Sequence, residues 1–241
     1  MRIAAATDLQ AVLPKVIEAF ATAQGVAVTP SFGASGNLAE QIRQGAPFDV
    51  FLSADMAFVR GLGDEGVIQA SSIEPYARGS LVLVVHPAAA DAVDELGDLA
   101  KPEVGKVAIA NPRFAPYGRA AREALERSEI WRKIEPKIVL AESVRQALVY
   151  EEHGDADAAL VGRSLIDVGG KPSTAGDKVI EVDSRLHAPL VQGLGIVARS
   201  KSPDQARAFV DFMLGGEGRR ILEESGFEPP DAERGVDSER R

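Results

Sequence analysis

The chain has 241 residues, of which 45% are hydrophobic and 26% charged, and its formal net charge at pH 7 is −9. This composition is typical of a globular protein with a sizeable core, and its acidic balance argues against a nucleic-acid partner. No apolar run reaches the ~18 residues that a membrane-spanning helix needs, and the absence of cysteine excludes disulfides and thiol nucleophiles.

Strand-like and helix-like segments alternate through the first quarter of the chain. Short apolar runs predict strands, and apolar residues at helical spacing predict amphipathic helices. The expected strands are 3–6, 26–32 and 50–53, and the expected helices are 10–24, 36–44 and 55–62. Gly25 stops the first of these helices, and Asp55 is expected to be the N-cap of the third rather than a ligand. This alternation predicts a parallel sheet with right-handed crossovers.

The same alternation continues to the C-terminus. The expected strands are 81–85, 106–110, 137–140, 158–161 and 190–198, and the expected helices are 91–100, 118–128, 144–152, 203–214 and 217–225. A loop is expected at 169–178, Gly226 is expected as a C-cap, and the polar sequence from Pro229 onward is expected to fray. Segments 76–80 and 182–189 are the expected crossovers between two α/β lobes that share a cleft.

Three turns of small residues each stand between an apolar strand and an expected helix. They are Ala5-Ala6-Thr7-Asp8-Leu9, Phe32-Gly33-Ala34-Ser35-Gly36-Asn37, and the stretch from Ala110 to Gly118. The first backbone N–H groups of a helix have no partner inside it, and the positive end of the helix dipole favours anions. We therefore expect a pocket for a small anion.

The residues of these turns, together with Gly45-Ala46-Pro47-Phe48-Asp49-Val50-Phe51-Leu52-Ser53-Ala54-Asp55, resemble the periplasmic molybdate-binding proteins of ABC transporters. The resemblance runs from about Ile3 to Phe227. It implies an α/β, two-lobed type II periplasmic-binding-protein fold, in which each lobe is a mainly parallel sheet flanked by helices and two crossover segments join the lobes. The implied lobe I is 1–79 plus 190–230, lobe II is 80–189, and 231–241 is a disordered tail.

The resemblance also implies a receptor that binds a tetrahedral oxyanion, molybdate and also tungstate, and delivers it to a membrane permease without catalysis. Hydroxyl and backbone N–H donors would hold the anion, with no metal-cation ligand and no cofactor. The implied contacts are Thr7, Asp8, Ser35, Tyr117 and Val144. We expect a monomer.

The chain departs from one common pattern of that family. A tyrosine that reaches the anion in this pattern is replaced here by Val161, and Thr7-Asp8 stands where many members have two serines. A carboxylate at Asp8 would repel a dianion, unless the ligand carried a proton. The favoured interpretation is that Asp8 caps its helix and only its N–H faces the pocket.

Other interpretations stay open from the sequence alone. The ligand is sulfate or phosphate in one alternative, because sequence does not give the size of the pocket. In another, the chain is a cytoplasmic anion sensor or enzyme, since Met1-Arg2-Ile3 leads directly into a strand without a signal peptide, whereas the resemblance implies the periplasm. Ser35 lacks the spacing and the histidine expected of a nucleophile, and Tyr117 could be a packed aromatic residue.

Overall fold

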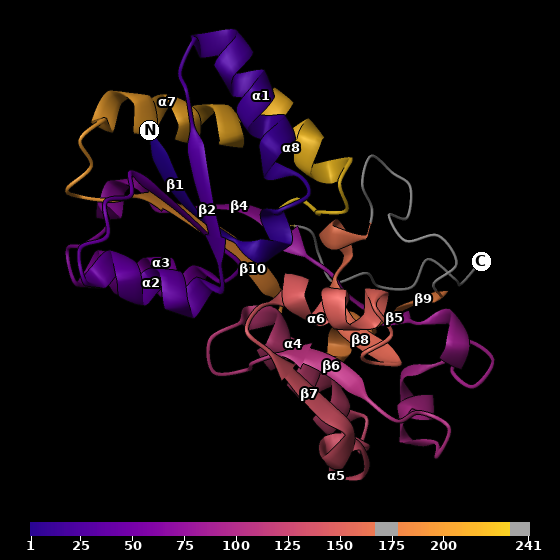
Figure 1. Ribbon diagram of the computed structural model, residues 1–241. Coiled ribbons are helices and arrows are strands. Elements are labelled where there is room, and N and C mark those ends of the chain that lie inside the picture. The colour runs from indigo at the N-terminus through magenta and orange to yellow at the C-terminus, as the bar shows by residue number, and fades with distance from the viewer. Residues whose placement is uncertain (167–177, 232–241) are drawn as a thin grey trace, which may run out of the picture.

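Two five-stranded sheets, one in each lobe, organise the chain in the computed structural model, which describes residues 1–166 and 178–231 (Figure 1). The strand order is β2-β1-β3-β10-β4 in the first sheet and β7-β6-β8-β5-β9 in the second. Each sheet is therefore built from segments that are far apart in the sequence. The α/β two-lobed fold expected from the sequence is confirmed.

The first sheet contains β1 (Arg2–Ala6), β2 (Thr29–Gly33), β3 (Val50–Ser53), β4 (Glu74–Gly79) and β10 (Leu190–Ile196). The strands β2, β1 and β3 run parallel, and β10 runs antiparallel to both β3 and β4. The carboxyl ends of β1 and β2 therefore lie at one edge of the sheet, which places the two turns that follow them side by side.

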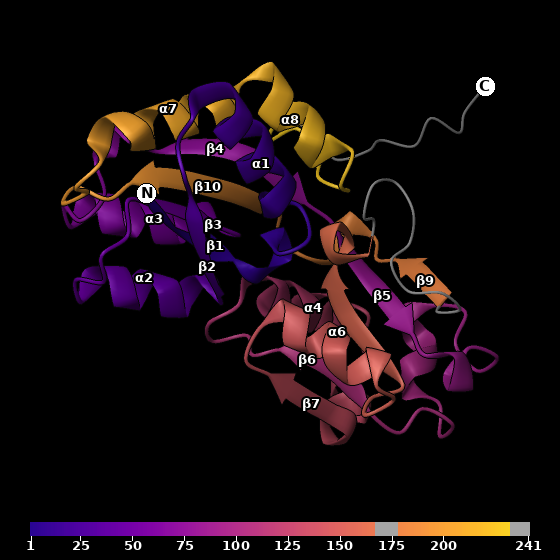
Figure 2. The same cartoon turned by 45° about the horizontal axis from the view of Figure 1, so that its top comes forward.

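Helices cover both faces of this sheet (Figure 2). On one face lie α1 (Leu13–Gln24), α7 (Pro203–Leu214) and α8 (Gly216–Glu223), and on the other lie α2 (Ser35–Arg43) and α3 (Met56–Asp64). Phe20 of α1 packs edge-on against Phe209 of α7, with ring centroids 5.2 Å apart. Because both faces are covered, the inner strands β1 and β3 are buried and largely apolar.

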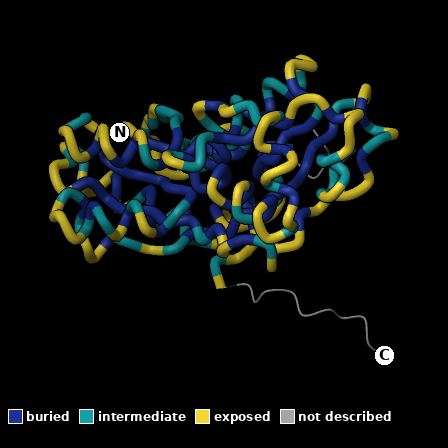
Figure 3. The backbone as a smooth tube through the Cα atoms, turned by 90° about the horizontal axis from the view of Figure 1, so that it is seen from below, coloured by how far each residue is buried: buried dark blue, intermediate teal, exposed yellow. Residues whose placement is uncertain are grey.

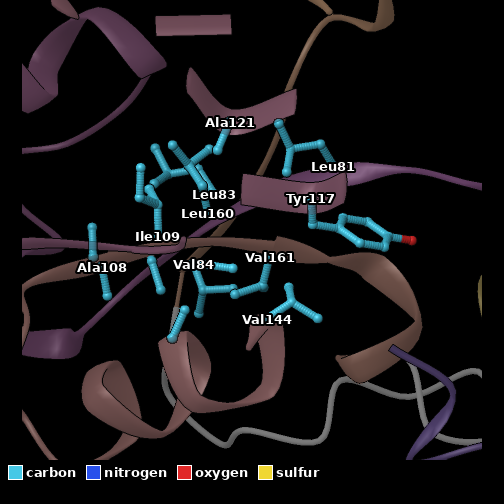
Figure 4. Close-up of a cluster of buried hydrophobic side chains, with 14 of the residues drawn as sticks. Leu81, Leu83, Val84, Ala108, Ile109, Tyr117, Ala121, Val144, Leu160 and Val161 are labelled. Carbon is cyan, nitrogen blue, oxygen red and sulfur yellow. The ribbon is translucent and has the colours of Figure 1, made fainter. Parts of the chain in front are cut away.

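The second sheet contains β5 (Leu81–Val85), β6 (Val107–Ala110), β7 (Ile138–Ala141), β8 (Ala158–Gly162) and β9 (Lys178–Glu181). The helices α4 (Pro116–Arg127) and α6 (Val144–Glu152) pack on opposite faces, and the short α5 (Trp131–Ile134) follows α4. Figure 4 shows the resulting cluster, with Ala121 of α4 on one side of the strands and Val144 of α6 on the other. All five residues of β5 are buried, which explains why this strand is uniformly apolar.

Short 3-10 helices account for several differences from the sequence-based expectations. They are η1 (Thr7–Leu9), η2 (Ala70–Ser72), η3 (Pro87–Ala89), η4 (Leu96–Ala100), η5 (Glu135–Lys137), η6 (Arg163–Leu165) and η7 (Ser184–Leu186). The helix expected at 91–100 is wrong, since only η4 forms there. The helix expected from residue 10 begins at Leu13, and the strand expected from residue 26 begins at Thr29.

The C-terminal half differs from the expectations at three further places. Gly226 has φ +82°, but Glu224 is the C-cap of α8. Lys178, expected in a loop, begins β9. The rest of that loop, from 169 to 177, and all but the first residue of the tail expected at 231–241 lie outside the described residues.

The chain crosses between the lobes at Ser80, directly between β4 and β5, and again in the segment before β10. Figure 3 shows that buried backbone lies inside both lobes and that exposed backbone lies in the outer loops. The lobes touch each other away from these crossings: the Gly36 N–H donates to the Phe114 carbonyl at 2.9 Å, and Arg119 forms an ion pair with Asp55. None of the helices in the described ranges is long and apolar enough to span a membrane.

Candidate functional site

A small buried cavity lies between the two lobes. Residues from the first lobe that line it are Ala6, Thr7, Asp8, Gly33, Ala34, Ser35 and Ala54, and those from the second are Ala115, Pro116, Tyr117 and Val144. The cavity is small: the centre of a water molecule can occupy a volume of about 10 Å³ in it. The five residues expected from the sequence as ligand contacts all line this cavity, so the structure brings them together.

Ser35 supplies a hydroxyl at the start of a helix. It is the first residue of α2 and is 1% exposed. Its Oγ accepts a hydrogen bond from the Ala54 N–H at 3.0 Å. Because a hydroxyl carries one donor and two acceptor positions, the hydroxyl proton of Ser35 stays free to be donated into the cavity.

Thr7 and Val144 bring further helix starts to the cavity. Thr7 follows β1 directly and begins η1, and Val144 is the first residue of α6. The Ser143 hydroxyl caps α6 by accepting from the Gln146 N–H at 3.2 Å, which leaves the N–H of Val144 without a partner inside the helix. The side chain of Val144 packs in the core of the second lobe, so only its backbone faces an anion.

Tyr117 sits in a space that two glycines, Gly79 and Gly162, leave open, and the glycine that follows it, Gly118, lets α4 approach β6 closely. It is the second residue of α4 and is 2% exposed. A Cβ on Gly118 would lie 2.0 Å from the Ala110 carbonyl oxygen, and a Cβ on Gly79 would lie 2.0 Å from the Tyr117 hydroxyl. Figure 4 shows the ring at the edge of the aliphatic cluster with its hydroxyl pointing away from that cluster.

Asp8 does not cap a helix, so the interpretation favoured from the sequence is wrong. The N-cap of η1 is Ala6, and no side chain caps this helix. Instead, the Asp8 Oδ2 accepts a hydrogen bond from the Gln192 Nε2 at 2.5 Å. The other oxygen, Oδ1, is buried and has no hydrogen-bond partner.

A buried polar network holds the Asp8 carboxyl group in place. The Gln192 Nε2 also donates to the Tyr117 hydroxyl at 3.2 Å, and the Gln192 Oε1 accepts from the Tyr76 hydroxyl at 2.5 Å. Ser164 of η6 donates to the backbone carbonyl of Asp8 at 2.9 Å. Sequence reasoning missed Gln192, Tyr76 and Ser164.

One signal in the sequence pointed to Gln192. Gln192 is a polar residue in the apolar run that was expected to be a strand. In the structure it is fully buried in β10, and the pairing of β10 with β4 shifts register between Gln192 and Gly193. Such an irregularity re-aims side chains, and it is common beside functional sites. Tyr76 and Ser164 carried no comparable local signal.

Burial shifts the acid–base properties of these groups. Burial raises the pKa of Asp8 from 3.8 to about 6, and the hydrogen bond from Gln192 opposes this shift. Burial, together with the nearby Asp8 charge, raises the pKa values of Tyr76 and Tyr117 well above 10. Both tyrosines are therefore neutral hydroxyl groups at physiological pH.

Among the described residues that line the cavity, none is a lysine, arginine or histidine. Across 1–166 and 178–231, no group of three or more acidic or histidine side chains is arranged to hold a metal ion. The cavity wall thus combines hydroxyl and backbone N–H donors with one carboxyl group, Asp8.

A wider cleft adjoins the cavity. It shares Thr7, Gly33 and Ala34 with the cavity and is lined further out by polar side chains of both lobes, including Asn37 and Glu142. The shared residues place this cleft directly beside the cavity.

Comparisons with known proteins agree with this architecture. The model of the family of bacterial extracellular solute-binding proteins matches residues 1–228. A molybdate-binding protein of Rhodobacter capsulatus is 35% identical over 209 residues, which cover 86% of this chain and 80% of that protein. A molybdate-binding protein of Azotobacter vinelandii is 32% identical over 228 residues, with 94% and 89% covered.

Solved structures of other proteins have the same fold. The structure of the periplasmic molybdate-binding protein of Azotobacter vinelandii matches with a TM-score of 0.90 at 29% identity, and the match covers 96% of this chain and all of that one. The sulfate-binding protein SubI of Mycobacterium tuberculosis shares the fold, with a TM-score of 0.79 at 19% identity. On the family match, the sequence relatives and the shared fold, this chain belongs to the bacterial extracellular solute-binding proteins.

Proposed function

We propose that this protein is the receptor of an ABC importer and binds a tetrahedral oxyanion, molybdate and also tungstate, in the cavity between its lobes. The observation that carries this proposal is the convergence of hydroxyl and helix-start N–H donors from both lobes on one buried cavity, where no cationic side chain of the described ranges takes part in the lining. Four relatives with the name of molybdate-binding protein, from different bacteria, support the choice of anion.

The chemistry of the anion suits this set of donors. Molybdate and sulfate are fully deprotonated dianions at neutral pH, so their oxygens only accept hydrogen bonds. A hydrogen bond to a charged acceptor contributes about 1.5–3 kcal/mol. Micromolar affinity needs about 8 kcal/mol after the costs of desolvation and closure, so several neutral donors suffice without a salt bridge.

In the proposed complex Thr7, Ser35 and Tyr117 donate hydroxyl hydrogen bonds, and Val144 donates through its backbone N–H. Thr7 and Ser35 belong to the first lobe, and Tyr117 and Val144 belong to the second. The anion would therefore draw the two lobes together. Residues 1–79 with 190–230 would move as one body and residues 80–189 as the other, in a hinge closure that shifts an existing equilibrium.

The protein would act outside the cytoplasm, in the periplasm, and deliver its anion to a membrane permease. It would act as a monomer and would catalyse no reaction. The description of the matching family as extracellular supports this location, and the Azotobacter vinelandii structure of the same fold is of a periplasmic protein.

Asp8 favours a second candidate ligand, an oxyanion that keeps a proton at neutral pH, such as monohydrogen phosphate. Such an anion could donate its proton to the unpartnered Oδ1 of Asp8. A fully deprotonated anion has no proton to donate, which makes the two ligand classes distinguishable.

Calorimetry of the purified, dialysed protein tests the proposal. The protein is titrated with molybdate, tungstate, sulfate and phosphate in separate experiments at pH 6.5. We expect submicromolar binding of molybdate and tungstate and much weaker binding of sulfate and phosphate. If none of the four anions gives heat or a thermal shift, the proposed function is wrong.

A further inference from the structure

We propose that the binding of a fully deprotonated oxyanion takes up one proton from solution, which Asp8 holds on Oδ1 in the complex and donates to the anion. This inference rests on the proposed function and concerns the residue that sets its specificity. An ionised Asp8 would repel the anion, whereas a protonated Asp8 would donate a hydrogen bond to it.

The geometry leaves one oxygen of Asp8 available for this task. Asp8 lines the cavity and is 0% exposed. Its Oδ2 is already engaged by Gln192, whose amide is held in turn by the Tyr76 hydroxyl. Its Oδ1 is buried without a hydrogen-bond partner, which is costly for an ionised oxygen, so a partner is expected there.

The groups around Asp8 offer no positive charge to offset an ionised carboxylate. From β10, β4, α4 and η6 it meets an amide and three hydroxyl groups, those of Gln192, Tyr76, Tyr117 and Ser164. The Gln192 amide, the Tyr117 hydroxyl and the nearby backbone N–H groups of Asp8 and Leu9 lower the pKa of Asp8, but burial outweighs them. Both tyrosines stay neutral. The arginines of the surrounding elements are engaged elsewhere: Arg119 of α4 pairs with Asp55, Arg145 of α6 pairs with Glu152, Arg163 of η6 pairs with Glu181, and Arg78 of β4 lies close enough to His187 to influence its charge.

An ionised Asp8 beside a dianion would therefore place three negative charges in one cavity lined by buried residues. In such a medium the repulsion between close charges is far stronger than in water. One proton removes this conflict and at the same time creates a donor. A neutral carboxyl group donates through O–H, whereas an ionised one only accepts.

The acidity of Asp8 agrees with this inference. Burial holds its pKa at about 6 without a ligand, and a dianion at contact distance raises the pKa of a carboxyl group further. Above pH 6 the free site is therefore mostly ionised while the complex is protonated. Binding must then consume a proton, and the affinity must fall as pH rises.

The test measures protons directly on the wild-type protein, with sodium molybdate as the probe. Titrations at pH 8 in two buffers of different ionisation enthalpy give the number of protons taken up, and we expect about one for each anion bound. Between pH 6 and pH 8 we expect the affinity to fall about 50- to 100-fold, because one proton is linked to binding. This measurement needs no variant.

The Asp8→Asn variant sharpens the test, because its Nδ2 carries hydrogens where the protonated acid carries one. It should bind molybdate at pH 8 about 50- to 100-fold more tightly than the wild type, and it should take up no proton on binding. Asp49→Asn is the matched control. Asp49 is also buried, but Arg2 N–H and Ser200 hydroxyl donors satisfy its two oxygens, so its substitution should leave the proton uptake unchanged.

Two results would overturn the inference. One is molybdate binding by the wild type with no proton uptake and a flat affinity from pH 6 to pH 8. The other is loss of molybdate binding in a folded Asp8→Asn protein. Absence of molybdate binding to the wild type at every pH would instead overturn the proposed function on which the inference rests.

Discussion

The cavity has two chemically different ends, one at Ser35 and one at Asp8, which would hold an anion in different ways. At the Ser35 end, the groups that can hold an anion are donors: the Ser35 hydroxyl already accepts from the Ala54 N–H and keeps its proton to donate, and α2 begins at this residue. At the Asp8 end, a carboxyl group faces the cavity, and its neighbours are an amide and two tyrosine hydroxyls that hold it in place.

The comparison shows that backbone geometry alone makes a donor site at one end, whereas the other end needs a proton. Helix starts present N–H groups at any pH, so the Ser35 end should be insensitive to pH. The Asp8 end should change its character with the charge of one side chain. Substitutions at the two ends should therefore change the anion affinity by different amounts, and these changes should also depend differently on pH.

The largest effect is expected from Gly118→Ala, which would break the Asp8 end by moving Tyr117. The new Cβ would meet the backbone oxygen of Ala110 at 2.0 Å, where neither partner can give way without shifting the start of α4. We expect the free energy of unfolding to fall by about 3 kcal/mol or more, with loss of anion binding. Urea denaturation and calorimetry measure both effects.

Gly61→Ala is the matched control for this substitution. Gly61 lies inside α3, and a Cβ there would meet nothing within 4 Å. Alanine should stabilise the helix by about 0.5–1 kcal/mol and leave binding unchanged. Equal stability of the Gly118 and Gly61 variants would contradict the close approach of α4 to β6.

The next largest effect should be seen in the stability of the Asp8→Asn variant without ligand. The Asp8 pKa is about 6 in the folded protein and 3.8 in the reference state, so the folded state binds more protons between these values. The stability of the wild type should therefore fall as pH rises through this window and stay lower above it. The variant has no carboxyl group at this position, so its stability should not fall in this way. Its free energy of unfolding relative to that of the wild type should therefore increase by up to about 3 kcal/mol between pH 4 and pH 7. Urea denaturation of both proteins across this range measures it, and a constant difference would show that Asp8 is not buried as described.

Ser35→Ala should weaken anion binding by about 10- to 150-fold, because a hydrogen bond to a charged acceptor is lost. The loss should be the same at pH 6 and pH 8, in contrast to substitutions of Asp8. Ser225→Ala is the control: Ser225 is also buried, but its hydroxyl has no hydrogen-bond partner and lies away from the cavity. Calorimetry with molybdate at both pH values checks this prediction, and a pH-dependent loss would count against a purely donating Ser35 end.

The smallest effect is expected from Arg119→Ala, which removes an ion pair between the lobes. Arg119 of α4 pairs with Asp55, whose other oxygen caps α3 as the sequence predicted. The Arg119 side chain is 47% exposed, so we expect only about a two- to fivefold loss of affinity at low salt, and less at high salt. Arg122 pairs with Glu126 within α4, and Arg122→Ala should leave the affinity unchanged. A salt-independent loss would mean that this pair does not contribute to closure.

Much of the fold could be predicted from the sequence because local signals agree with the tertiary structure. The strands β3 and β5 and the helices α6 and α7 begin and end where their apolar patterns and turn residues predict. The strand β9 could not be predicted in this way. It is a four-residue strand that is only partly buried, and its place in the sheet comes from its pairing with β5.

In the candidate site, too, local features could be predicted from the sequence and long-range contacts could not. The turns after β1 and β2 and before α4 were visible as small residues between strands and helices and predicted an anion pocket, and the resemblance to the periplasmic molybdate-binding proteins implied Thr7, Ser35 and Tyr117 as contacts. The role of Asp8 depends on Gln192, which is 184 positions away along the chain. No local pattern contains such a contact, and for this reason the capping interpretation of Asp8 was wrong.

The central claim is that the anion sits between the lobes on donors from both of them. Diffraction from crystals grown with sodium tungstate tests it most directly, because tungsten gives a strong anomalous signal at a defined position. The account predicts one strong peak within the cavity, with the tungstate oxygens at hydrogen-bond distance from the Ser35 and Tyr117 hydroxyls and the Val144 N–H. A tungstate that occupies only surface positions, or a cavity left empty at saturating tungstate, would contradict it.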